Sequence, residues 1–72
     1  TGSSPIQYVI RRRMGEAQNL LISTDFSAAQ IAAMVGYDSA SHFNSIFKRV
    51  VGLPPVRFRQ WYLVTMRGKR KQ

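Results

Sequence analysis

The chain has 72 residues, with 11 lysines and arginines against three acidic residues, which gives a formal net charge of +8. This length allows one small domain, and with no cysteine, one histidine and three scattered carboxylates we expect no disulfide, metal site or cofactor. Such an excess of positive charge repels itself in a folded chain, so we expect a polyanionic partner: nucleic acid first, an anionic membrane surface second.

The first predicted helix covers about residues 5–22. Ser4 is suited to cap it, and Gln7, three residues later, completes a capping box. One stripe of apolar residues at helical spacing follows this helix: Ile6, Val9, Ile10, Met14, Ala17, Leu20 and Leu21.

The second predicted helix is capped by Ser27, has Gln30 three residues later, and is ended by Gly36. Its expected apolar face consists of Ala28, Ile31, Ala32, Met34 and Val35.

A third helix is predicted over about residues 40–51, capped by Asp38 or Ser39 and stopped by Gly52. Its apolar stripe consists of Phe43, Ile46, Phe47 and Val50. A fourth helix begins near Pro55, and its expected inward residues are Phe58, Trp61 and Tyr62.

A short capped helix, a turn opened by Gly36 and a longer second helix are typical of a helix-turn-helix unit. We therefore predict an all-α fold, a homeodomain-like bundle of three to four helices with a long N-terminal helix. Residues 25–66 would form the helix-turn-helix unit with its closing helix, and residues 67–72 a solvated basic tail.

Because the apolar stripe of the third helix is buried, the opposite face, centred on Ser41, Ser45 and Lys48, should point outward. Polar residues at its start and cations at its end suit a helix that enters the major groove of double-stranded DNA by its N-terminal half. Asn44 is the best candidate to read a base, because its amide can pair bidentately with adenine. Ser41 and Ser45 would discriminate bases less strongly.

Phosphate contacts are expected from the third helix and from an arginine cluster on the first. Arg13 falls on the apolar side of its helix, so it should extend outward or meet a phosphate. The expected backbone contacts are Arg11, Arg12, Arg13, Ser39, His42, Lys48 and Arg49.

In these residues the chain resembles the AraC/XylS family of bacterial transcription regulators. The matching segments, within about residues 3–60, are 4–8, 13–17, 31–37, 41–43, 47–49 and 52–59. The resemblance implies two helix-turn-helix halves joined by a linker helix, here about residues 5–22, with the second half at about 27–58. It places base contacts near Ala40, Ser41, Asn44 and Ser45, and Lys48 toward phosphate. Serine at position 45, where many members carry arginine, implies weak sequence discrimination.

The resemblance also implies promoter DNA as partner, activation of transcription, and contact with RNA polymerase by the intact protein. A short internal match agrees with it: residues 1–8 align with 51–58, with glycine, proline, aliphatic and aromatic residues at equivalent places. Chance is the alternative explanation. Residues 1–24 would then hold the end of a first half and the linker helix, whose exposed side favours self-association through Ile6, Ile10 and Leu21.

Two other classes of protein stay open. One is a protein-interaction module that docks RNA polymerase or another partner and has little DNA affinity. The other is a membrane-surface peptide, although the caps and the internal turn favour a preformed bundle. No membrane span or signal peptide is recognisable, so we expect a cytoplasmic protein. His42 has no nucleophile or orienting acid to serve, so we expect no enzymatic activity.

Overall fold

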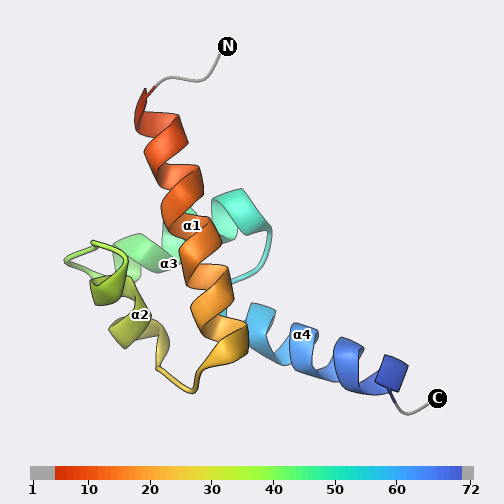
Figure 1. Cartoon of the computed structure of the whole chain (residues 1–72). Helices are drawn as coiled ribbons and strands as arrows, with labels where there is room; N and C mark the ends of the chain where they lie inside the picture. The colour runs from red at the N-terminus through yellow and green to blue at the C-terminus, as the bar shows by residue number, and fades with distance from the viewer. Residues whose placement is uncertain (1–4, 71–72) are drawn as a thin grey trace.

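The computed structural model describes the backbone of residues 5–70 and the side chains of residues 5–66. Four helices follow one another: α1 (Pro5–Ser23), α2 (Ala28–Met34), α3 (Ala40–Val51) and α4 (Pro55–Arg70). Figure 1 shows α2 and α3 gathered around α1, while the first turns of α1 and the last turns of α4 project from the bundle. No strand occurs over residues 5–70, and the predicted all-α fold is confirmed.

Local capping interactions begin α2 and α3 where the sequence predicts. The Ser27 hydroxyl accepts the N–H of Gln30 at 3.1 Å, and the Gln30 side chain accepts the N–H of Ser27 at 2.9 Å, which completes a capping box. Ser39, and not Asp38, caps α3 by accepting the N–H of His42 at 3.3 Å. These bonds satisfy amide groups that have no partner inside their helices.

Two glycines end helices as expected. Gly36 and Gly52 have φ values of 101° and 105°, the left-handed region that a chain commonly adopts just after a helix. The predicted cap of α1 by Ser4 lies outside the described residues.

All four helices contribute to the core. The buried apolar side chains are Met14, Ala17, Leu21, Ile31, Ala32, Val35, Phe43, Phe47 and Phe58. α1 packs against α2, α3 and α4, so the long first helix supplies part of the same core as the helix-turn-helix unit. The predicted division after residue 24 falls in the loop between α1 and α2.

Several predicted inward positions are wrong. Ile6, Val9, Met34, Val50 and Trp61 are all exposed. An apolar stripe is buried only where another helix lies beside it, and the first turns of α1, with Ile6 and Val9, project from the bundle (Figure 1). The Cα radius of gyration of 13.1 Å, against about 11 Å for a compact chain of this length, reflects the same projection.

One further expectation needs correction. Leu21 is 1% exposed, so it cannot contribute to a surface for self-association with Ile6 and Ile10. The backbone of residues 67–70, in the predicted basic tail, continues α4. Residues 71–72 lie outside the described residues.

Candidate nucleic-acid interface

α3 has one face in the core and one face in solvent. Phe43 and Phe47 are fully buried. The polar and cationic residues of the opposite face are exposed: Ser41, Asn44, Ser45 and Lys48. Ala40, at the first position of the helix, is half-buried. The side chains that the sequence assigned to base reading therefore share the solvent side of one helix.

A row of aromatic rings fixes the rotation of α3 about its axis. Tyr37 contacts Phe43 at a centroid distance of 5.8 Å, Phe43 contacts Phe47 at 5.7 Å, and Phe47 contacts Phe58 of α4 at 5.6 Å. Such ring contacts add stabilisation beyond the burial of apolar area. Because the rings determine which side of α3 is buried, they also determine which side chains face outward.

The expected phosphate contacts fall into two groups. Those with exposed side chains are Arg11, Arg12, Ser39, His42, Lys48 and Arg49. Arg13 is half-buried and has partners within the protein. The Ser39 hydroxyl caps α3, and the His42 ring meets Tyr37 edge-on at 5.6 Å, so these two also hold the start of the helix.

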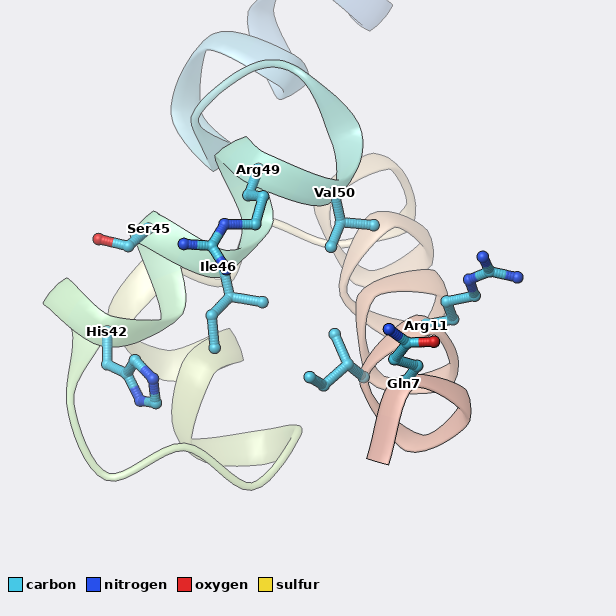
Figure 2. Close-up of a pocket in the computed structure, with 8 residues that line it drawn as sticks. Gln7, Arg11, His42, Ser45, Ile46, Arg49 and Val50 are labelled. Carbon is cyan, nitrogen blue, oxygen red and sulfur yellow. The ribbon is translucent and has the colours of Figure 1, made fainter. Parts of the chain in front are cut away.

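A groove of about 590 Å³ separates the first turns of α1 from α3. Its lining residues are Gln7, Ile10, Arg11, His42, Ser45, Ile46, Arg49 and Val50. Figure 2 shows Ile46 and Val50 pointing across it toward α1, with His42, Ser45 and Arg49 along α3. A second hollow of about 430 Å³ shares three of these residues and reaches Ile6 and Tyr37. The groove thus combines an apolar interior with cations at its edges, next to the exposed face of α3.

Arg59 has an internal role that the sequence analysis did not assign. Its Nε donates to the carbonyl oxygen of Leu21 at 2.8 Å, and its Nη2 donates to those of Thr24 at 3.0 Å and Phe26 at 2.7 Å. The one signal in the sequence is the absence of a basic residue from the last turn of α1. That absence leaves the negative end of the helix dipole to be compensated from elsewhere in the fold.

Arg13 has contacts within the protein that the sequence did not predict. Its guanidinium carbon lies 5.4 Å from the centroid of the Tyr37 ring, and its Nη1 is 3.4 Å from the carbonyl oxygen of Gly36. The side chain therefore packs on the turn between α2 and α3.

Over the part of the chain that the structure describes, no three histidine or acidic side chains gather in a way that could hold a metal ion. None of the described helices is long and apolar enough to cross a membrane.

Residues 1–60 match the model of a family described as helix-turn-helix domain. YdiP of Escherichia coli K12, an uncharacterized HTH-type transcriptional regulator, is 46% identical over 59 residues, which cover 82% of this chain and 20% of that protein. RhaS of Escherichia fergusonii, an HTH-type transcriptional activator, is 37% identical over 60 residues, with 83% and 22% covered. The chain thus spans about a fifth of the length of these relatives.

The fold agrees with this match. The DNA-binding domain of AdpA, solved in complex with a target DNA, has a TM-score of 0.82 and 35% identity to this chain. The match covers 100% of this chain and 61% of that one. With a family match over residues 1–60 and this likeness of fold, the chain belongs to the AraC/XylS family of helix-turn-helix transcription regulators.

Proposed function

We propose that the chain binds double-stranded DNA in a sequence-specific manner, with α3 in the major groove, as part of a bacterial transcription regulator. The observation that carries the proposal is the exposed face of α3, polar in its N-terminal half and cationic at its C-terminal end. A helix with a rigidly buried opposite face can insert such side chains into the groove at a fixed depth. AdpA, whose domain matches the whole chain, was solved with a target DNA.

The residues of α3 take different roles in this proposal. The Asn44 amide donates to and accepts from an adenine edge, while the Ser41 and Ser45 hydroxyls bond to bases of either kind. The Ala40 methyl contacts a thymine methyl. Lys48, in the last turn of α3, reaches a phosphate.

The remaining phosphate contacts lie around this helix. Arg49 joins Lys48 at the C-terminal end, Ser39 and His42 lie at the start, and Arg11 and Arg12 contribute from α1. These contacts supply affinity and orientation, whereas the bases supply specificity. We propose binding alone, with no catalytic step.

In the full regulator, the first helix-turn-helix half covers the first turns of α1, and this chain is the second half. Pro55 and Phe58 of α4 pack in this chain's own helix-turn-helix half: Pro55 is fully buried and Phe58 is 8% exposed. Their equivalents in the internal match differ: Pro5 is exposed and Tyr8 is 62% exposed. A first half packed on α1 would bury Pro5 and Tyr8 in the way that this chain's own half buries Pro55 and Phe58. The AdpA chain is long enough to include such a half, since 39% of it (100 minus 61) lies outside the match.

The intact regulator, in this proposal, acts in the cytoplasm, binds promoter DNA and recruits RNA polymerase to activate transcription. RhaS, a relative, is named an activator. Where no preceding half covers α1, we expect copies of the chain to associate through the exposed Ile6 and the half-buried Ile10. A strictly monomeric sedimentation profile at high concentration would contradict this association.

Selection of bound sequences from a pool of random duplexes tests the main proposal. We expect enrichment of a short motif and an affinity that falls steeply as salt rises, because phosphate contacts release counterions. Lys48→Ala should lower the slope of log affinity against log salt by about 1. No enrichment together with salt-insensitive binding would contradict DNA recognition and favour a protein-docking module.

A further inference from the structure

Side chains from α4 and α1 contact the two ends of α2. It has only seven residues, and an isolated helix of that length does not persist in water. Neither α1 nor α2 has a basic residue in its last turn. An arginine from another helix lies at each of these two C-terminal ends, and the two arginines flank α2.

Arg59 of α4 holds the junction where α1 ends and α2 begins. Its three hydrogen bonds, of 2.7 to 3.0 Å, go to the carbonyl oxygens of Leu21, Thr24 and Phe26. These carbonyls belong to a helix end and a loop, where no intrahelical partner is available. Phe26 directly precedes Ser27, the cap of α2, so the start of α2 is bound to α4.

Arg13 of α1 holds the other end of α2. The Arg13 guanidinium lies over the Tyr37 ring. A Cβ added at Gly36 would lie 3.2 Å from this guanidinium, which is closer than an ordinary van der Waals contact. Tyr37 in turn contacts His42 at 5.6 Å and Phe43 at 5.8 Å, both in the first turns of α3. A path of direct contacts therefore joins α1 to the start of the helix that faces DNA.

We propose that Arg13 and Arg59 are positioning residues for DNA recognition, which fix α2 and the start of α3 and contact no phosphate. Both are half-buried: Arg59 donates three hydrogen bonds to backbone carbonyls, and Arg13 donates one of 3.4 Å while it packs on the Tyr37 ring. For Arg13, the proposed positioning role replaces the phosphate contact that the sequence predicts. The inference rests on the proposed DNA binding, because it concerns the geometry that this binding requires.

Charge-conserving variants separate position from charge. Arg13→Lys and Arg59→Lys keep the positive charge but lose the planar fork of donors and the flat surface that stacks on a ring. Arg57→Lys is the matched control, because this exposed arginine lies two residues before Arg59 on α4 and belongs to none of the proposed DNA contacts. Dissociation constants are measured for the 72-residue chain with a duplex enriched from the random pool and with a scrambled duplex. The temperature is one at which circular dichroism shows every variant folded.

We expect the ratio of specific to non-specific affinity to fall roughly tenfold in Arg13→Lys and Arg59→Lys and less than about twofold in Arg57→Lys. A variant that only unfolds more often loses both affinities by the same folded fraction, and its ratio does not change. An unchanged ratio would therefore overturn the positioning role.

Salt dependence separates positioning from phosphate contact. Arg12→Ala should lower the salt slope by about 1, whereas Arg13→Ala and Arg59→Ala should leave it unchanged. A decrease of about 1 in either of the latter variants would make that arginine a phosphate ligand and overturn the inference for it.

Amide hydrogen exchange of the chain without DNA tests whether the two arginines stabilise α2, and it does not depend on the binding assay. Amides of α2 should exchange at least about tenfold faster in Arg13→Lys and Arg59→Lys than in Arg57→Lys. If the unsubstituted chain fails to select any DNA, the proposed function fails while this measurement still decides whether the arginines hold α2. Equal exchange in all variants would overturn that role.

Discussion

Phe47 of α3 and Phe58 of α4 meet edge to face, with ring centroids 5.6 Å apart and ring planes inclined by 70°. Phe47 is fully buried and Phe58 is 8% exposed. The pair joins the helix proposed to read DNA to the helix that closes the bundle. The orientation of α3 therefore depends on α4, although α4 contributes no residue to the proposed base contacts.

Replacing Phe58 by leucine should lower the free energy of unfolding by about 1–2 kcal/mol, because an aromatic contact is lost and the core repacks imperfectly. Trp61→Leu is the control: Trp61 is 51% exposed, and its effect should be less than half as large. Urea unfolding followed by circular dichroism measures both. Equal losses would mean that the interior position of Phe58 does not govern its contribution.

Gly36 and Gly52 offer a comparison at nearly the same backbone angle. Alanine at either position is strained at φ near 100°, at a cost of about 1 kcal/mol. At Gly36 the new Cβ also lies 3.2 Å from the Arg13 guanidinium, while at Gly52 nothing lies within 4 Å. Gly36→Ala should therefore destabilise more than Gly52→Ala in urea unfolding. In an Arg13→Ala background the difference should disappear, and its persistence would show that Arg13 is not its cause.

Ser39 separates helix capping from contact with DNA. Ser39→Ala should cost about 1 kcal/mol of stability, because the His42 N–H loses its acceptor. Ser39→Asp restores an acceptor and places a negative charge at the favourable end of α3, so stability should return. Beside a phosphate the same charge should lower duplex affinity by roughly tenfold.

The matched control for this charge is Ser27→Asp, which caps α2 equally but lies outside the proposed interface. Its duplex affinity should change less than about twofold at physiological salt, where distant charges are screened. Similar affinities for the two aspartate variants would remove Ser39 from the set of backbone contacts.

Asn44→Ala should cost roughly 1–3 kcal/mol on the selected duplex and little on a scrambled one, since only a base reader loses its contact selectively. Its stability should be unchanged within about 0.5 kcal/mol, because the side chain is exposed. Titrations with both duplexes give the comparison. Equal losses on the two would mean that Asn44 reads no base.

The bounds of α3 could be predicted from sequence because its signals are local. Ser39 and Gly52 determine where α3 starts and ends, and the structure places it at Ala40–Val51 as expected. The spacing of its aromatic residues likewise predicts its exposed face, since one turn of helix fixes both sides together. The individual DNA contacts on that face stay predictions.

The features that the sequence did not predict depend on contacts between segments far apart in the chain. Trp61 and Met34 have the spacing of core residues, but the helices that would cover them do not lie there. Arg59 bonds to Leu21, 38 residues earlier, and no local pattern identifies that partner. The sequence places Arg13 on the apolar side of its helix but does not identify its partners, because the turn on which it packs is distant in sequence.

The two-sided construction of α3 has a consequence for how such regulators diverge. Side chains at positions 41, 44, 45 and 48 point to solvent and make no contribution to the interior. Exchanges there change stability by no more than about 0.5 kcal/mol, so new binding preferences can arise without endangering the scaffold. Under the proposed function, a few substitutions on this face change the DNA sequence that is bound and leave the architecture unchanged.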